Sequence, residues 1–280
     1  MKMFASTAIA AALVLALPAC KQQPQATGAD NTAATTEAAG DVSALNGTWK
    51  ADLASLKFEQ KPDEFLLKDG SYSCSTCIPP LSLAADGQFH AVKDRPYYDS
   101  MSIKAVDDKT VEIHRKKGDK EVSSVTMQVS ADGNQLTNKF TDGTVTPPVQ
   151  GTGTEKRVGP APEGAHAISG QWMPDRISDY SQEALNLTYR VEGNKVTFSS
   201  QGQSYTAELG GPAVPVQGDI GGTMAAVARE GNGIRETLTR GGKEVGVNTI
   251  VPSANGNSIS FTGTDPRDGS KVTFTANKAS

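Results

Sequence analysis

The chain has 280 residues, which is enough for two modest domains. Hydrophobic residues make up 37% of it and glycine contributes another 28 residues, an ordinary globular composition that excludes a wholly disordered chain. Its 27 Lys and Arg residues are outnumbered by 31 Asp and Glu residues, a net charge of -4, so we expect no nucleic-acid partner.

Residues 1–19 have the pattern of an export signal peptide. Lys2 supplies a positive charge, and residues 5–17 form an apolar run interrupted only by Ser6 and Thr7. This run is shorter than the roughly 20 residues that a membrane-spanning helix needs, so it indicates a signal peptide.

The signal ends in Leu17-Pro18-Ala19-Cys20, which resembles the lipobox of bacterial lipoproteins. The resemblance implies that cleavage leaves Cys20 as an acylated N-terminus, whose two or three palmitate-like chains hold the protein firmly in a membrane. Lys21 follows, whereas in lipoproteins that resemble those of enterobacteria an aspartate there favours inner-membrane retention. The resemblance therefore implies an outer-membrane lipoprotein facing the periplasm. The alternative is an ordinary secretory signal with a chance cysteine at the cleavage site.

Residues 20–44 consist mainly of Gln, Ala, Thr, Asn and Pro, with almost no large apolar side chain. Such a segment cannot bury enough surface to offset its ordering entropy. We therefore predict a disordered tether that holds the folded part about 25 Å from the membrane.

The rest of the chain contains an internal repeat with an offset of 123 residues. Gly47-Thr48-Trp49 matches Gly170-Gln171-Trp172, and Lys120-Glu121-Val122 matches Lys243-Glu244-Val245. Such a constant offset predicts two repeats, residues 45–157 and 168–280. Residues 158–167 between them are rich in proline and glycine and are predicted to be an interdomain linker.

Within each repeat the apolar residues alternate with polar ones, the period of half-buried strands. Examples are Leu187, Tyr189 and Val191 in the second repeat and Val125, Met127 and Val129 in the first. Short turn sequences rich in Gly, Asn and Asp separate these runs. We therefore predict an all-β fold of two tandem antiparallel β-barrels or compact sandwiches, with closure favouring the barrel. Residues 181–185 are expected to form one helical turn.

The opening Gly47-Thr48-Trp49-Lys50-Ala51-Asp52 resembles the G-T-W-K start of bacterial lipocalin-like domains. The second repeat keeps Trp172 and Asp175 but has Met173-Pro174 after the tryptophan, so its resemblance is weaker. The resemblance implies that each tryptophan seals the closed end of a barrel beneath a basic side chain from a late strand. Lys156, Arg157 and Lys278 are the candidates for that cap. The alternative is that Trp49 and Trp172 are simply large core residues.

Cys74 and Cys77 are three residues apart in an oxidising compartment and are predicted to form a disulfide with each other. Thioredoxin-like exchange needs such a pair at a helix N-terminus, whereas here a predicted strand precedes it and two prolines follow. Ile78 replaces the histidine needed for haem attachment, and His90 lacks the second histidine of a zinc finger. We therefore expect no metal and no cofactor.

The catalytic inventory is thin. The histidines are His90, His114 and His166, and none stands in a nucleophile motif, so we expect no catalytic residues and no enzyme activity. The basic run at residues 114–117 is expected to be a solvated hairpin tip. Residues 265–269 are expected to be a hairpin turn rather than a calcium loop.

Two classes of function remain open. One is a structural or interaction lipoprotein whose barrels are filled by their own side chains and whose surfaces contact other envelope components. The other is a module that binds a small apolar ligand, which would need a cavity of about 300 to 1,000 Å³. The low aromatic content, 6%, favours filled interiors. Residues 74–80 and 210–218 are expected to be irregular loops, and residues 210–215 are expected to cover one barrel end.

Overall fold

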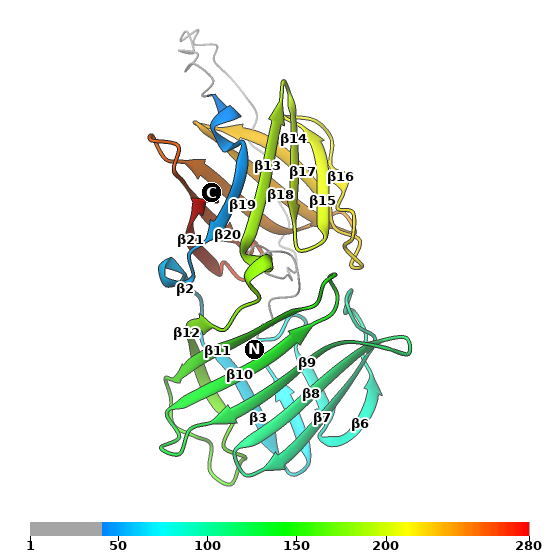
Figure 1. Ribbon diagram of the computed structural model, residues 1–280. Helices are drawn as coiled ribbons and strands as arrows, with labels where there is room; N and C mark the ends of the chain where they lie inside the picture. The colour runs from blue at the N-terminus through cyan, green and yellow to red at the C-terminus, as the bar shows by residue number, and fades with distance from the viewer. Residues whose placement is uncertain (1–40, 280) are drawn as a thin grey trace, which may run out of the picture.

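The computed structural model describes residues 41–279. They form two antiparallel sheets, each curled into a nearly closed barrel, which stand end to end (Figure 1). The predicted all-β fold with two small barrels is therefore confirmed. The predicted signal at 1–19, the lipid attachment site Cys20 and the tether up to residue 40 lie outside the described residues.

Barrel A is the eleven-stranded sheet. Its edges approach each other where Leu209 bridges to Val227 and Ser204 to Gln217. Its strands are β1 (Gly47–Ala51), β2 (Lys57–Glu59), β13 (Asn186–Glu192), β14 (Lys195–Ser200), β15 (Gln203–Glu208), β16 (Val214–Pro215), β17 (Met224–Glu230), β18 (Gly233–Arg240), β19 (Lys243–Pro252), β20 (Ser258–Thr264) and β21 (Lys271–Lys278).

Barrel B is the ten-stranded sheet, in which β5 and β6 are the two edges and follow each other along the chain. Its strands are β3 (Asp63–Lys68), β4 (Ser71–Cys74), β5 (Leu81–Ala84), β6 (Asp86–Ala91), β7 (Ser100–Asp107), β8 (Thr110–Lys117), β9 (Lys120–Val129), β10 (Gln135–Asp142), β11 (Val149–Arg157) and β12 (Gly170–Ser178). Three short 3₁₀ helices, η1 (Val42–Leu45), η2 (Leu53–Ser55) and η3 (Gln182–Leu185), complete the structure, and η3 is the expected helical turn.

The two repeats exchange their first strands. Strand β1 of the first repeat lies in barrel A between β13 and β21, and β12 of the second repeat lies in barrel B between β3 and β11. Residues 158–167 are therefore a loop between neighbouring strands of one barrel, and the expected linker between two domains is not found there. The chain passes between the barrels at residues 60–62 and 179–181 instead. Barrel B is thus continuous in sequence, whereas barrel A is built from both ends of the chain.

The exchange preserves strand pairing because β1 and β12 occupy equivalent places. Trp49 lies opposite Lys278 in barrel A, and Trp172 lies opposite Arg157 in barrel B. On their other sides, Trp49 faces Leu187 and Trp172 faces Asp63. Each barrel therefore receives a strand whose tryptophan lies opposite a basic residue.

The repeat itself is visible in the strands. Strands β1 and β12 begin 123 residues apart, and so do β8 and β18, β9 and β19, and β10 and β20. Even the irregularity after Arg115 in the pairing of β8 with β9 recurs after Leu238 in the pairing of β18 with β19. The sequence repeat therefore corresponds to a repeat of barrel structure.

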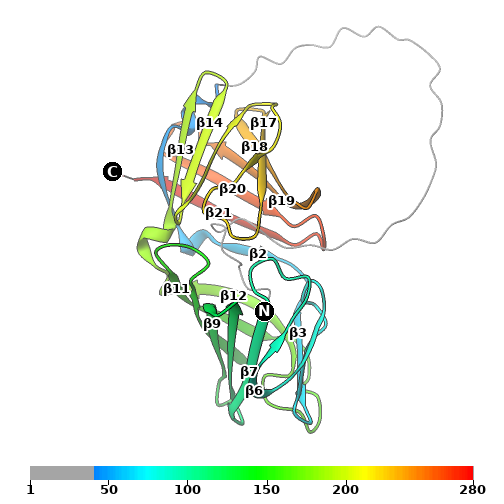
Figure 2. The ribbon, with the colours of Figure 1, turned by 90° about the vertical axis from the view of Figure 1, so that its right-hand side faces the viewer.

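The barrels face each other through one end each (Figures 1 and 2). Helix η1 lies at the outer pole of barrel A, and the loop between β11 and β12 lies at the outer pole of barrel B. Val42 and Leu45 of η1 are buried in the core of barrel A, so the folded part begins before residue 44, earlier than the predicted end of the tether.

Candidate binding cavity and capped barrel ends

Each outer pole is closed by a tryptophan. The indole Nε1 of Trp49 donates to the Leu45 carbonyl at 2.8 Å, and that of Trp172 donates to the Ile168 carbonyl at 2.8 Å. Both side chains are fully buried. The same local hydrogen bond, made four residues back along the chain, therefore fixes the tryptophan in each barrel.

A basic side chain lies over each tryptophan, as the sequence predicts. The Lys278 ammonium is 5.4 Å from the Trp49 ring centroid, and the Arg157 guanidinium carbon is 4.0 Å from that of Trp172. Lys156 instead pairs with Asp175 at 2.6 Å. Because of the strand exchange, each cation covers the tryptophan of the other repeat.

Arg157 is also hydrogen bonded to three backbone carbonyls. Its guanidinium donates to Gly133, Ser169 and Ala167 at 2.7, 2.7 and 2.6 Å. Loss of water around the side chain lowers its pKa, although the group remains a cation. Arg157 therefore ties the β9–β10 turn to the loop that precedes β12.

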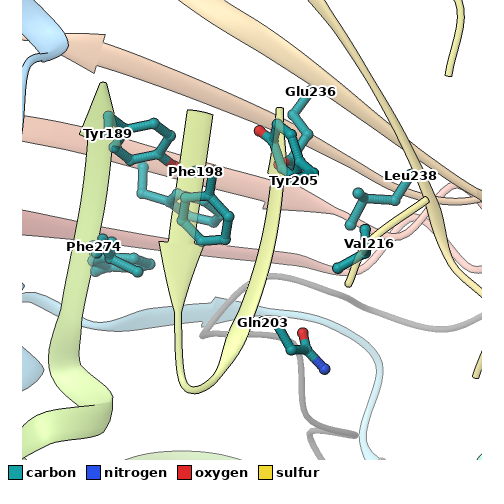
Figure 3. A pocket seen from close by; sticks show the side chains of 10 residues that line it. Tyr189, Phe198, Gln203, Tyr205, Val216, Glu236, Leu238 and Phe274 are labelled. Atoms are coloured by element: carbon teal, nitrogen blue, oxygen red, sulfur yellow. The ribbon is translucent and has the colours of Figure 1, made fainter. Parts of the chain in front are cut away.

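Barrel A contains a small cavity, and Figure 3 shows the side chains that line it. The space open to water in it is about 20 Å³, which holds one or two water molecules. Most of its lining is aromatic or aliphatic, and the lining residues are Leu187, Tyr189, Phe198, Gln203, Tyr205, Val216, Glu236, Leu238, Phe261 and Phe274.

Glu236 is the buried carboxyl group of this cavity, with 6% of the residue exposed. Burial raises its pKa, and the Asn248 side-chain amide donates to it. The Tyr205 hydroxyl lies beside the Glu236 carboxyl group, and Asn248 Oδ1 is buried without a hydrogen-bond partner in the described residues. A protonated Glu236 or a water molecule in the cavity can supply the missing partner of Asn248.

Barrel B has its own buried polar residues. Asn138 donates to Glu155 at 2.7 Å, and burial raises the pKa of that carboxyl group, with nearby Asp63 adding to the effect. Arg115 is also buried, with its guanidinium carbon 5.3 Å from the Tyr98 ring centroid. The expected solvated hairpin tip at 114–117 is therefore wrong for Arg115, while Lys117 is exposed.

The predicted disulfide joins Cys74 and Cys77, with an S–S distance of 2.08 Å. The residues that follow it in the β4–β5 loop are held by Arg95, whose guanidinium donates to the Ile78 carbonyl at 2.7 Å and to the Pro79 carbonyl. The β4–β5 loop is thus fixed both covalently and by a cation from the β6–β7 loop.

Each of the three histidines has a partner of its own. His90 pairs with Asp86 at 2.8 Å, His114 pairs with Glu121 at 2.9 Å, and His166 bonds to the Asp107 carbonyl. Within residues 41–279 no group of three or more His, Cys, Asp or Glu residues is arranged to hold a metal ion. No helix in the same range is long and apolar enough to cross a membrane.

The turn expected at residues 265–269 connects β20 and β21, as predicted, but it carries a buried ion pair. Arg267 Nε lies 2.8 Å from Asp265 Oδ1, and both side chains are almost fully buried. Loss of water lowers the pKa of Arg267 to about 8, although Asp265 opposes this shift. Sequence reasoning missed this pair.

The alternation of buried and exposed residues along the strands could have revealed the buried charges Glu236 and Arg115. Glu236 lies on the same face of its strand as the buried Ile234 and Leu238, and Arg115 lies on the same face as Val111 and Ile113. A charged residue in the inward phase of a strand therefore indicates a buried polar site.

Comparisons with protein families, with characterised proteins and with solved structures found no match to this chain.

Proposed function

We propose that this chain is a non-catalytic lipoprotein of the bacterial cell envelope, anchored by lipid on Cys20, facing the periplasm, and active through contacts between its barrels and other envelope components. The lipobox resemblance supports the anchor, and Lys21 supports the outer membrane as its location. The similarity of the G-T-W-K segment to lipocalin-like domains supports a role in binding or assembly rather than in chemistry.

The filled interior of barrel A carries the proposal. Its cavity of about 20 Å³ is far below the 300 to 1,000 Å³ typical of ligand pockets. Aromatic side chains occupy the space, with ring centroids 5.1 Å apart for Tyr189 and Phe198 and 4.7 Å apart for Phe261 and Phe274. The outer surfaces of the barrels, rather than this interior, are thus available to partners.

The path of the chain indicates which barrel would be joined to the anchor. Because Val42 and Leu45 pack into barrel A, a lipid on Cys20 would be connected to the outer pole of barrel A. Barrel B would then be joined to the anchor only through barrel A, and the surfaces of both barrels would be open to partners in the periplasm.

Metabolic labelling with an alkyne analogue of palmitate tests the anchor. The native chain should take up the label and sediment with membranes, whereas Cys20→Ala should lose both properties. Cys74→Ser/Cys77→Ser is the matched control, because it removes two cysteines and leaves Cys20 in place. Equal labelling of Cys20→Ala and the native chain would contradict the proposal.

A second candidate function is the binding of a small apolar ligand with one polar group. It is favoured by the aromatic lining of the cavity and by Glu236, Tyr205 and Asn248, whose polar atoms meet within barrel A. Mass spectrometry of the protein isolated under native conditions distinguishes the two functions. A stoichiometric small molecule that disappears in Glu236→Leu would favour ligand binding over the interaction role.

A further inference from the structure

One tyrosine of barrel B is inserted into the facing end of barrel A. Tyr97 belongs to the loop between β6 and β7, and only 4% of it is exposed. A Cβ atom on Gly221 of barrel A would lie 2.7 Å from Cζ of the Tyr97 ring. The tyrosine therefore fits against barrel A only because residue 221 has no side chain.

The Tyr97 hydroxyl is hydrogen bonded to two oppositely charged residues of barrel A. It donates to Asp219 Oδ1 at 2.9 Å and accepts from Arg240 Nη2 at 2.6 Å. The Arg240 guanidinium carbon also lies 4.9 Å from the Tyr97 ring centroid. Burial raises the pKa of Tyr97 to about 12, so the hydroxyl keeps the proton that it donates to Asp219 at neutral pH.

Thr223 completes a closed ring of hydrogen bonds. Its backbone N–H donates to Asp219 Oδ2 at 2.7 Å, and its hydroxyl accepts from Arg240 Nη2 at 2.8 Å. Tyr97, Asp219, Thr223 and Arg240 thus hold one another in place. Three of them belong to barrel A, and only Tyr97 comes from barrel B.

The segment fixed by this ring also contributes to the wall of the cavity in barrel A. Val216 lines the cavity and donates its backbone N–H to the Thr223 carbonyl at 2.9 Å. Gln217 exchanges two backbone hydrogen bonds with Ser204, next to the lining residue Gln203. Figure 3 shows Val216 and Gln203 on the same side of the cavity, away from Tyr189.

We propose that Tyr97 is a latch through which barrel B keeps residues 216–223 closed over the cavity of barrel A. The cavity becomes accessible when the two barrels separate and the tyrosine leaves its place beside Gly221. Any partner that pulls on barrel B would thereby open barrel A. This inference is independent of the membrane anchor.

Hydrogen–deuterium exchange on the full chain tests the latch. Tyr97→Phe keeps the ring but removes the hydroxyl, and it should speed exchange of the Val216 and Thr223 amides at least about tenfold, since bonds to charged groups are lost. Tyr98→Phe is the matched control, because Tyr98 is the adjacent tyrosine and contacts Arg115 within barrel B. It should leave these amides unchanged.

Gly221→Ala tests the same contact from barrel A, because the added methyl group meets the Tyr97 ring. It should also speed exchange in residues 216–223 while the amides of β12 stay protected. Unchanged exchange in Tyr97→Phe or in Gly221→Ala would overturn the latch. An equal increase throughout both barrels would also overturn it, because it would indicate general loss of stability.

Discussion

Glu236 couples the stability of barrel A to pH. Burial raises its pKa in the folded protein, so the folded state keeps a proton at pH values where the unfolded chain has released it. The stabilising effect is complete below the unfolded pKa of about 4.3 and is lost as the pH rises through the folded value. The buried Glu155 adds a dependence of the same sign in barrel B.

Glu236→Gln should therefore stabilise the protein at alkaline pH and have little effect in acid. The glutamine side-chain oxygen can still accept the hydrogen bond from Asn248, and its amide group can donate to the buried Oδ1 atom of Asn248. No charge is then buried. Urea unfolding at about pH 5 and about pH 8 measures the difference. Glu244→Gln, at an exposed position of β19, is the control, and equal shifts in the two variants would contradict this account.

Arg157→Lys should lower the free energy of unfolding by about 1 to 2 kcal/mol, because a lysine cannot reproduce three directed hydrogen bonds to carbonyls. Lys156→Arg should change it by less than about 0.5 kcal/mol, since Lys156 makes an exposed ion pair. Urea unfolding followed by Trp172 emission, in a Trp49→Phe background, measures both. A smaller loss for Arg157→Lys than for Lys156→Arg would refute the cap.

At the level of strands, local patterns predicted much of what is found. The alternation around Tyr189, the turns and the 123-residue offset all correspond to real strands and connections. The barrel to which β1 belongs was not predictable from these patterns, because a period of two determines the buried face and not the partner. Since β1 and β12 are repeats of each other, the two pairings satisfy the same local rules.

The candidate site was less predictable than the fold. Arg157 and Lys278 follow from the tryptophan motif, but Tyr97, Asp219 and Arg240 meet only because two barrels come together. The buried charges also differ between the repeats. The position equivalent to Arg115, 123 residues later, is Leu238, and the position equivalent to Glu236, 123 residues earlier, is Ile113. The repeats therefore share a framework and differ in where each interior carries its charge.

Cleavage of the loop between β11 and β12 tests how the strands interlock. A specific protease site inserted after Glu163, which is exposed, would produce one fragment with β1 and another with β12. Each fragment then supplies a strand to the barrel of the other, so the two should stay together at nanomolar concentration in size-exclusion chromatography. Separation of the fragments without denaturant would contradict the exchange.

On the scale of the whole molecule, the exchange of strands β1 and β12 holds the two similar barrels together. The chain crosses between the barrels twice, and Tyr97 adds a contact at the facing ends. The ends of the barrels that carry the tryptophan caps point away from each other, and the opposite ends face each other (Figure 2). Contacts at the facing ends therefore involve residues of both barrels. Strand exchange therefore holds the two barrels together, and the latch at their facing ends depends on it.

An engineered disulfide measures the exchange most directly. The hydroxyl oxygens of Thr48 in β1 and Thr188 in β13 are 2.9 Å apart, close enough for cysteines there to bond. In a chain carrying Cys20→Ser, Thr48→Cys/Thr188→Cys should form an intramolecular disulfide on mild oxidation, whereas Thr48→Cys/Glu64→Cys should not. Without exchange, residue 48 would take the place of Gln171 opposite Glu64, and the second pair would bond instead of the first.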